Sequence, residues 1–356
     1  MGCIIPPLND QGRFHRSAGV FDADGGFIHL ANVRRGDRLE IQPRQAPAMP
    51  EAMLKGRHLY GGQLNHHFGH FLCESLARLW ALAEAGEPVE SILLLPRRSG
   101  SEREFRGFHQ QAFRLLGLTV PVRIVEEPMR VEELIVPAQD FGIGDMAAGT
   151  PRFIRYMRHS FAPDVAPDGP EHLYVSREGL SLLTGSIIGE ETLSRNLAKS
   201  GYVEFRPEEH DLRTQIARYK AARRIVSVEG SALHLYGFVA HPAQKVAIIA
   251  RRSDHVAARA IAAQIRAFGG AEATIFDGIR REWDTHDAFE RSSKSVTEID
   301  FPALARQLGD AGFIEERDWK NLHCNVERRV ARIAGRTGRA YRLITASARA
   351  QAEVVS

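Results

Sequence analysis

Apolar and polar residues follow two periods along this chain, and the clearest helical period lies near residue 70. Residues 65–80, NHHFGHFLCESLARLW, place their apolar side chains three and four positions apart, which predicts an α-helix with one buried face. Beside that face a polar stripe recurs at every fourth residue, formed by His66, His70, Glu74 and Arg78. Surface helices ordinarily carry mixed lysine and glutamate in such a stripe, so this one marks candidate chemistry.

The predicted helix begins at Asn65, a residue type that caps helices through its side-chain oxygen. Gly61 and Gly62 precede it and allow the backbone to approach a neighbouring group closely. The first turn of such a helix offers free N–H groups and a positive dipole end, which favour an anionic ligand.

Three interpretations of the polar stripe are open. His66, His70 and Glu74 could bind zinc, although the sequence has neither an HExxH motif nor a separate acidic cluster to complete a hydrolase. Alternatively, His70 or Glu74 accepts a proton from a hydroxyl group, and Arg78 orients the carboxylate or contacts a ligand. An ordinary core helix, with locally satisfied histidines, explains the same pattern.

Short apolar runs alternate with helical periods in the rest of the first half. Residues 91–95, SILLL, form a continuous apolar run before Pro96, as buried parallel strands do. Residues 102–116 have a helical period and are followed by Gly117. Further short strands are predicted at 122–125 and 134–136, which together indicate an α/β layer with a parallel sheet.

A proline-rich stretch, FAPDVAPDGPEH at 161–172, predicts a linker between two domains, after which the alternation starts again. This pattern predicts a doubly wound parallel sheet. Beyond residue 275 the period weakens, with helices expected at 301–308 and 319–334. We therefore predict an N-terminal α/β domain (1–165), a second α/β domain (170–275) and a mostly helical extension (276–356). In the second domain, strands are expected at 173–175, 202–205, 224–228 and 245–249, and helices at 190–199, 211–222 and 232–240.

The composition is that of a globular protein, with 44% hydrophobic and 26% charged residues among 356. A net charge of +3 does not favour nucleic-acid binding, and no apolar run reaches the ~18 residues that span a bilayer. The N-terminal residues lack the pattern of a secretion signal. Cys3, Cys73 and Cys324 are far apart and odd in number, so we expect a cytoplasmic protein without disulfides.

Seven arginines and no acidic residue lie between Arg328 and Ala352. They could contact anionic lipid at the inner face of the membrane, or another polyanion. We favour a solvated helix, because Gly335 and Gly338 interrupt a long amphipathic face.

Two further motifs suit phosphate binding. In YVSR, at 174–177, Arg177 follows the predicted end of a parallel strand, where open α/β sheets bind ligands, and its guanidinium fits a diphosphate. The alternative is a simple ion pair with Glu178. In EGSALH, at 229–234, a strand leads through a Gly-Ser turn into a helix, a layout that presents N–H groups to phosphate.

Within that second motif, Gly230 permits close approach, Ser231 could cap the helix, and His234 falls one turn further on. Glu229 could bind sugar or ribose hydroxyls. The motif is neither GxGxxG nor a P-loop, so NAD and ATP chemistry lose support. An ordinary strand–turn–helix remains the alternative.

Taken together, these motifs resemble glycosyltransferase family 61, whose bacterial members are often described as capsular polysaccharide biosynthesis proteins. Asn65, FGHF at 68–71, Glu74 and Arg78 resemble the family's N-terminal block, and YVSR begins its C-terminal block. Gly201, Pro207-Glu208 and Gln215 match its middle, and EGSALH aligns with an HGAxLxN-type turn. Two departures are that GSIIGEE retains only Glu190 of an Arg and Asn-Glu pattern, and that Glu229 and His234 replace His and Asn.

The resemblance implies two Rossmann-like domains facing across a cleft, the GT-B arrangement, and an inverting transfer. The donor would be a nucleotide sugar, with a UDP-sugar favoured, and the acceptor a glycan or lipid-linked glycan; no metal is required. Rival functions are a nucleotide-sugar epimerase or hydrolase, an inactive glycan-binding module, and the metallohydrolase considered above. The implied base is His70 or Glu74; the donor would contact Ser176, Arg177, Glu229, Gly230, Ser231 and His234, and the acceptor side would include Asn65, His66, His67 and Arg78.

Overall fold

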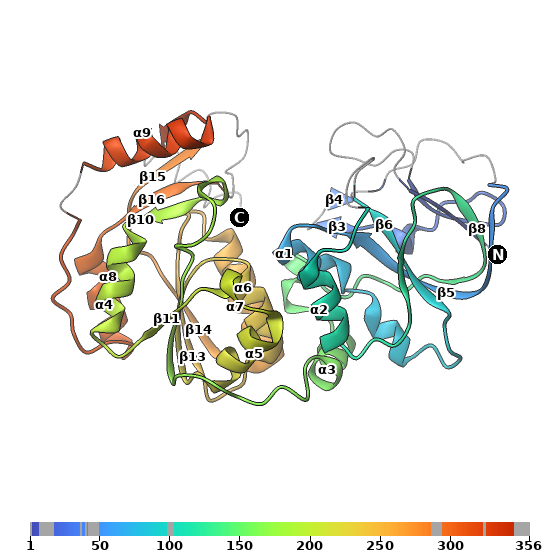
Figure 1. Ribbon diagram of the computed structural model, residues 1–356, viewed down its shortest axis with the longest axis horizontal. Coiled ribbons are helices and arrows are strands. Elements are labelled where there is room, and N and C mark those ends of the chain that lie inside the picture. Colours follow the sequence, from blue (N-terminus) through green and yellow to red (C-terminus); the bar gives the residue numbers. More distant parts are fainter. Residues whose placement is uncertain are drawn as a thin grey trace. The chain divides into compact units, whose positions relative to one another are not determined.

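A computed structural model describes residues 2–6, 18–35, 38–39, 41, 50–97, 103–285, 294–322 and 325–344. The chain divides into two compact units, Met1–Asp164 (unit 1) and Val165–Ser356 (unit 2), shown in Figure 1. The division falls inside the proline-rich stretch 161–172. Cys324 lies outside the described residues.

Unit 1 is built on a six-stranded mixed sheet with the order β2-β1-β8-β5-β6-β7. Neighbours from β8 to β7 pair in parallel, as the sequence predicts, whereas β1 pairs antiparallel with both β2 and β8. The sheet is therefore mixed rather than parallel throughout. Its strands are β1 (Gly2–Ile5), β2 (Gly19–Asp22), β5 (Met53–Leu64), β6 (Ser91–Pro96), β7 (Val122–Ile124) and β8 (Met129–Ile135).

The remaining elements of unit 1 are short. β3 (Arg34–Arg35) and β4 (Arg38–Leu39) form a separate two-stranded ribbon, and α2 and α3 are the longer helices. Helix α2 starts later than the period predicts, and Gly117 follows it with a φ of 65°, as expected after a helix. The helical elements are η1 (His29–Ala31), α2 (Gly107–Leu115), η4 (Gly144–Ala148) and α3 (Pro151–Ser160).

The central strand β5 includes Gly61 and Gly62, which precede the predicted helix. A Cβ atom at Gly61 would lie 2.8 Å from side-chain atoms of both Ile92 and Leu94, so glycine allows β5 to pack against β6. The pairing of β5 with β6 shifts register between Tyr60 and Gly62. The chain after Leu64 thus leaves directly from the middle of the sheet.

The single helix predicted over 65–80 is wrong. The structure has a short α1 (Phe68–His70), a π-helical turn η2 (Phe71–Ser75) and a 3-10 helix η3 (Leu79–Ala83). The N-cap is His67 rather than Asn65. The physical reason is Ser75, whose hydroxyl donates to the Gln63 carbonyl at 2.6 Å and accepts from the Asn65 N–H at 3.0 Å, and so ties the turn to the end of β5.

Unit 2 contains a five-stranded parallel sheet with the order β11-β9-β12-β13-β14, the doubly wound pattern that the sequence predicts. Helices α5, α6 and α7 cover one face, and α4 and α8 cover the other (Figure 1). Asp211 caps α5 by accepting from the Thr214 N–H at 2.7 Å, as predicted. The elements are β9 (His172–Val175), β11 (Val203–Phe205), β12 (Arg224–Val228), β13 (Lys245–Ile249), β14 (Glu272–Phe276), α4 (Glu190–Ala198), α5 (Leu212–Ala221), α6 (Ala232–Val239), α7 (Val256–Gly269) and α8 (Phe301–Asp310), with η5 (Leu182–Thr184) and η6 (Pro207–Glu209) between them.

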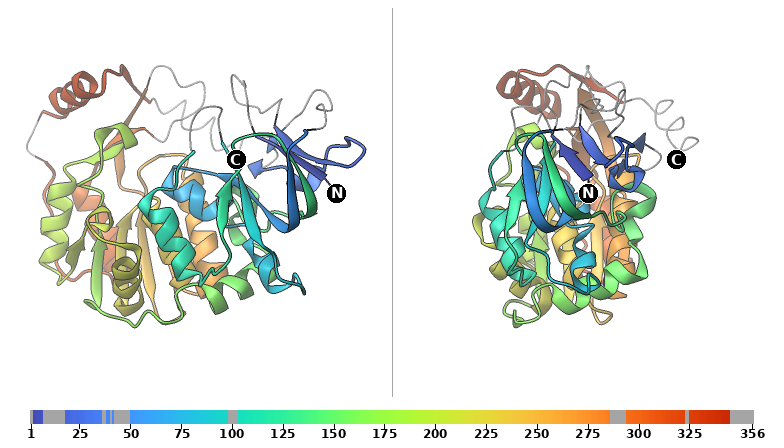
Figure 2. Two further views of the ribbon diagram at one scale, coloured as in Figure 1. Left: turned by 45° about the vertical axis from the view of Figure 1, so that its right-hand side comes forward. Right: turned by 90° about the vertical axis from the view of Figure 1, so that its right-hand side faces the viewer.

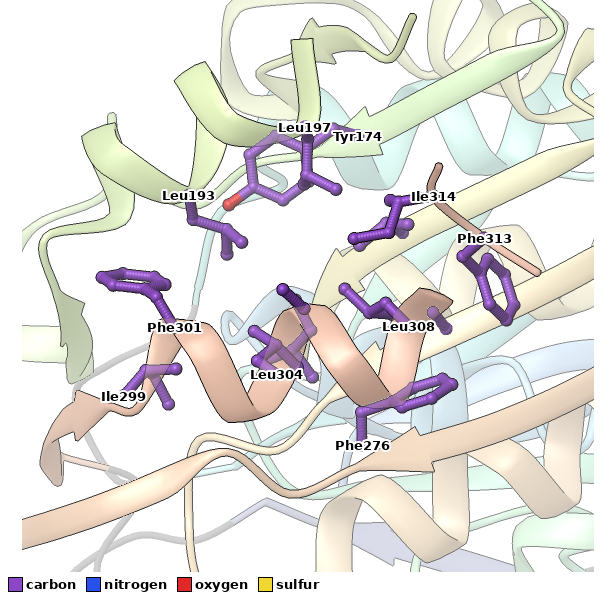
Figure 3. Close-up of a cluster of buried hydrophobic side chains, with 14 of the residues drawn as sticks. Tyr174, Leu193, Leu197, Phe276, Ile299, Phe301, Leu304, Leu308, Phe313 and Ile314 are labelled. Carbon is purple, nitrogen blue, oxygen red and sulfur yellow. The ribbon is translucent and has the colours of Figure 1, made fainter. Parts of the chain in front are cut away.

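The buried core beside this sheet includes residues from beyond position 275. Figure 3 shows Phe301, Leu304 and Leu308 of α8 directed toward Leu193 and Leu197 of α4. Burial of each such side chain stabilises the folded state by ~1.5–3 kcal/mol. Helix α8 is therefore part of the core of unit 2, not an appendage.

In the described part of the region beyond 275, the structure has strands in addition to the two helices α8 and α9. A four-stranded sheet with the order β10-β16-β15-β17 joins this region to the body of unit 2. Val326 and Val330 of α9 pack with Ile188, Trp283 and Val296 on it, and Figure 2 shows α9, in red, at this end of unit 2. The elements are β10 (Ser186–Ile188), β15 (Ile279–Thr285), β16 (Val296–Ile299), α9 (Val326–Thr337) and β17 (Tyr341–Leu343).

Within the described residues, none of the helices has the length and apolar character required to span a membrane. Arg328, Arg332 and Arg336 are exposed on α9 at four-residue spacing. This arrangement fits both the membrane contact and the solvated helix considered from the sequence.

Candidate functional site

The polar residues of unit 1 follow the central strand of its sheet. The chain passes from β5 to β6 and β7 on one side and returns to β8 on the other side of β5. Open α/β sheets bind ligands outside the carboxyl ends of the strands at such a switch point. Asn65, His66, His67 and His70 come directly after β5 and therefore lie at this edge.

Glu74 is the centre of a buried ionic network. Arg35, on β3, donates from Nε to Glu74 Oε1 at 2.7 Å and from Nη2 to Oε2 at 2.5 Å. His70 Nδ1 lies 3.2 Å from Glu74 Oε1, and Arg35 also reaches Asn65 Oδ1 at 3.3 Å. The side chains of Arg35 and Glu74 are 5% and 1% exposed, whereas that of His70 is 30% exposed. One side of the His70 ring is thus bonded to Glu74, and part of the ring remains accessible to solvent.

The network keeps Glu74 ionised. Burial alone would raise its pKa, but the hydrogen bonds from His70 and Arg35 lower the pKa of Glu74 to about 2. A carboxylate this weakly basic is a poor proton acceptor near neutral pH. Because Nδ1 faces Glu74, Nε2 is the ring nitrogen of His70 that is placed to exchange a proton with a ligand.

The remaining predicted residues of unit 1 serve the local structure. Arg78 is buried and donates to the carbonyl groups of Leu30 (2.8 Å), Asn32 (2.5 Å) and Pro137, rather than joining a solvated stripe. Asn65 is fully buried. His66 Nε2 bonds to the Glu104 carbonyl at 2.8 Å, while the exposed His67 ring lies edge-on to His70 with the centroids 5.0 Å apart.

His109, on α2, is a buried histidine near this edge. It accepts from the Arg106 N–H through Nδ1 at 3.0 Å, so Nε2 donates to the Asn65 carbonyl at 3.0 Å. Burial is the main reason that the pKa of His109 falls to about 4. His109 is therefore neutral and fixes the backbone from which Asn65 and His66 project.

The zinc interpretation of the stripe finds no support. His66 Nε2 is directed to a carbonyl group, and His70 Nδ1 to Glu74. Across the described part of the chain, no cluster of three or more histidine, cysteine, aspartate or glutamate side chains could hold a metal ion.

In unit 2 the switch point lies between β9 and β12, because β11 extends the sheet on one side of them and β13 and β14 on the other. Both predicted motifs fall there: Ser176-Arg177 follows β9, and Glu229-Gly230 follows β12. All five strands are parallel, so these residues share one edge of the sheet.

Arg177 lies directly over the turn at Gly230. A Cβ atom at Gly230 would be 2.4 Å from Arg177 Nη1, so glycine permits this contact. The ion pair with Glu178 that served as the alternative is not present, since Glu178 pairs with Arg206 at 3.1 Å. Arg177 Nη2 is 3.5 Å from the Thr184 carbonyl, and Nε is buried with no hydrogen-bond partner among the described residues.

Glu190 connects the two blocks of the motif. Its Oε1 accepts from the Tyr174 hydroxyl at 3.0 Å, the Ser176 hydroxyl at 3.3 Å and the Arg177 N–H at 2.6 Å. Ser176 is consequently buried and bonded within the protein. The one acidic residue retained from the family pattern at this position therefore fixes the backbone that carries Arg177.

Glu229 is engaged by arginines that follow β13. Arg252 donates to Glu229 Oε1 from Nη2 at 2.6 Å and from Nε at 3.0 Å, and Arg251 Nη2 is 4.0 Å away. Glu229 Oε2 is buried without a hydrogen-bond partner in the described part of the structure. Burial, and then the charge of Arg177, lower the pKa of Arg251 to about 10. Crowded, desolvated guanidinium groups of this kind are stabilised by a bound anion.

Ser231 does not cap α6 as predicted, and His234 contacts α7. Ser231 occupies the N-cap position of α6 but makes no capping hydrogen bond with its side chain. His234 is half-buried, and its Nδ1 lies 2.7 Å from Gln264 Oε1 on α7, whose amide donates back to the His234 carbonyl at 2.9 Å. This pair joins α6 to α7.

The small sheet supports the loop after β13. Thr297, on β16, donates its hydroxyl to the Arg251 carbonyl at 2.6 Å, and Glu282, on β15, accepts from the Ser253 hydroxyl at 2.6 Å. Sequence reasoning missed Arg35, Arg251 and Arg252. An Arg-Arg pair directly after the apolar strand 245–249 was a signal for the last two, whereas the pairing of Arg35 with Glu74 has no local signal.

Comparison with known families agrees with these motifs. The family model of glycosyltransferase 61 matches residues 68–247, just over half of the chain. No match is found among curated proteins. The chain belongs to glycosyltransferase family 61, which confirms the resemblance stated from the sequence. Residues 70, 74, 177 and 229–234 lie inside the matched region, and Arg35, Arg251 and Arg252 lie outside it.

Proposed function

We propose that this protein is an inverting glycosyltransferase that moves a sugar from a nucleotide-sugar donor, preferably a UDP-sugar, to a hydroxyl group of a glycan or lipid-linked glycan. The proposed setting is bacterial surface or capsular polysaccharide synthesis at the cytoplasmic face of the membrane. Family membership supports sugar transfer as the reaction class. The observation that supports a diphosphate-containing donor is the guanidinium cluster of Arg177, Arg251 and Arg252 at the switch point of unit 2.

In this proposal, unit 2 holds the donor. Arg177 and the backbone at Gly230 contact the diphosphate, whose negative charge grows as the bond to the anomeric carbon breaks. Arg251 and Arg252 add positive charge at the same edge. Glu229 Oε2 accepts a hydrogen bond from a hydroxyl group of the donor. Ser176 contributes indirectly, by bonding to the Glu190 carboxylate that holds the backbone at Arg177. His234 contributes by joining α6 to α7 through Gln264.

Unit 1 supplies the base. The acceptor oxygen attacks the anomeric carbon, its proton passes to His70 Nε2, and the nucleoside diphosphate leaves with the electron pair of the broken bond. Glu74 orients His70 and stabilises the imidazolium that forms, so His70 is preferred to Glu74 as base. The proposal includes the GT-B arrangement, with the donor of unit 2 served by the base of unit 1.

The first experiment is a thermal-shift screen against UDP-, GDP-, CMP- and dTDP-sugars, because a ligand that binds only the folded state raises its stability. We expect one nucleotide class to raise the Tm of the wild-type protein and not that of Arg177→Ala. Turnover with the selected donor is then followed by NMR of the anomeric proton of the product. Retention of the donor's anomeric configuration, or release of free sugar regardless of acceptor, would contradict the inverting transfer.

A further inference from the structure

The buried pair of Arg35 and Glu74 brings together two segments that are far apart in sequence. Arg35 belongs to the β3–β4 ribbon, while Glu74 lies in the π-helical turn that follows β5. Both side chains are almost fully buried, and the guanidinium binds both carboxylate oxygens. Burying an ion pair costs desolvation energy, and hydrophobic residues of similar size often serve stability as well. A role in the chemistry explains its position one hydrogen bond from His70.

The charges around His70 define that role. Among the described residues, the groups that face its ring are the Glu74 carboxylate at Nδ1 and the edge of His67, with Arg35 behind Glu74. Without Arg35, the buried Glu74 and its partner His70 would share one additional proton. That proton would lie either on His70, giving a carboxylate and an imidazolium, or on Glu74, giving a carboxylic acid and a neutral imidazole. Either form holds that proton tightly, because burial disfavours an isolated carboxylate.

Arg35 changes this balance, since a guanidinium is a permanent cation. It neutralises Glu74 without a proton, so the carboxylate can accept the hydrogen bond from Nδ1 of His70. We propose that Arg35 is a positioning residue of the reaction, which fixes Glu74 as the carboxylate partner of His70 Nδ1 and thereby leaves Nε2 to take the acceptor proton. This inference rests on the proposed function of His70 as the base.

The test is an NMR titration of His70 in the ligand-free full chain with labelled histidine, comparing wild type with Arg35→Gln and Arg35→Lys. Arg34→Gln is the matched control, because Arg34 is the neighbour of Arg35 but is half-exposed and pairs with Asp145 at 3.1 Å. We expect the titration midpoint of His70 to rise by about one pH unit or more in Arg35→Gln. It should change much less in Arg35→Lys and not at all in Arg34→Gln.

The same variants are assayed for transfer between pH 5 and 9. In Arg35→Gln the acid limb of kcat/KM should move to higher pH together with the NMR midpoint, and Arg35→Lys should restore most of the profile. A folded Arg35→Gln with an unchanged His70 midpoint, or with activity reduced equally at every pH, would overturn the proposal.

A double variant decides the matter if Arg35→Gln does not fold. Arg35→Gln/Glu74→Gln replaces the ion pair by two amides that can still bond to each other. Without a carboxylate at Nδ1, His70 should titrate at lower pH than in wild type, and a wild-type midpoint would refute the role of the pair. Because the titration needs no substrate, it judges Arg35 even if the protein transfers no sugar, whereas full activity of His70→Ala would refute the proposed function alone.

Discussion

The two units place polar residues at equivalent points of their sheets, yet the charges there are arranged in opposite ways. In unit 1 a buried carboxylate, Glu74, is the centre, and Arg35 and His70 surround it. In unit 2 guanidinium groups dominate, and Glu229 holds Arg252. The first arrangement suits handling of a proton and the second suits binding of an anion. One sheet topology rule thus accommodates two kinds of chemistry, and the side chains that follow the strands decide between them.

The sharpest way to break this comparison is His70→Ala. If unit 1 handles the proton, kcat should fall by about 10²–10⁴-fold, the usual contribution of a general base, while donor affinity stays unchanged. His159→Ala, an exposed histidine on α3, is the control. Steady-state kinetics and calorimetric titration with the donor measure the two quantities, and weakened donor binding with intact kcat would reverse the assignment of the units.

Arg177→Ala is the complementary change in unit 2. We expect donor affinity to fall by about 10- to 100-fold, because hydrogen bonds to charged groups contribute ~1.5–3 kcal/mol. The acid limb of the pH profile should not move, since Arg177 is not part of the His70 network. Arg195→Ala on α4, an exposed arginine, should bind the donor as wild type does. Equal calorimetric affinities for Arg177→Ala and wild type would argue against a donor site at this edge.

Acid should destabilise unit 1 through two groups. The pKa of His109 is about 4 in the folded state and ~6.5 when unfolded, so its stabilising effect is lost as the pH falls from ~6.5 to 4. The pKa of Glu74 is about 2 in the folded state and ~4.3 when unfolded, so its stabilising effect is lost as the pH falls from ~4.3 to 2. Urea unfolding followed by circular dichroism should show a loss on the order of 2 kcal/mol between pH 7 and 4.5. His109→Gln should flatten this dependence, and an unchanged slope would show that His109 is not its cause.

Two glycine substitutions give the smallest effects. Gly230→Ala brings a methyl group against Arg177, so the guanidinium must move, and we expect roughly tenfold weaker donor binding with a stability change under ~1 kcal/mol. Gly335→Ala on α9 meets nothing within 4 Å and should stabilise the helix by up to ~1 kcal/mol without affecting the donor. Thermal unfolding and donor titration of both variants distinguish a specific contact from a general backbone effect.

Much of unit 2 could be predicted because each strand and helix is signalled by its own residues. Strand 224–228 and its successor at 245–249 are short runs of mainly apolar residues, and both form as predicted. The strands beyond 275 were missed because β15 carries charged residues such as Glu282 and Asp284, whose burial depends on partners elsewhere in the fold.

The candidate site was only partly predictable. His70 and Glu74, four residues apart in the predicted stripe, do lie in contact, but the same spacing wrongly placed Arg78 in the stripe. A run of apolar residues does not distinguish α-helical from π-helical bonding, and the choice here depends on Ser75 reaching back to β5. Partners such as Arg35 become visible only once distant segments are brought together.

The central position of β5 has a practical consequence for fragments of this protein. The family match begins at Phe68, after β5 has ended, and stops at Ala247, within β13. A fragment cut at those limits would lose the strand that joins the two halves of its first sheet, together with the last strand of its second. Recombinant pieces chosen by homology alone should therefore precipitate or degrade, whereas pieces that begin before β1 and end after β14 retain every strand of both sheets.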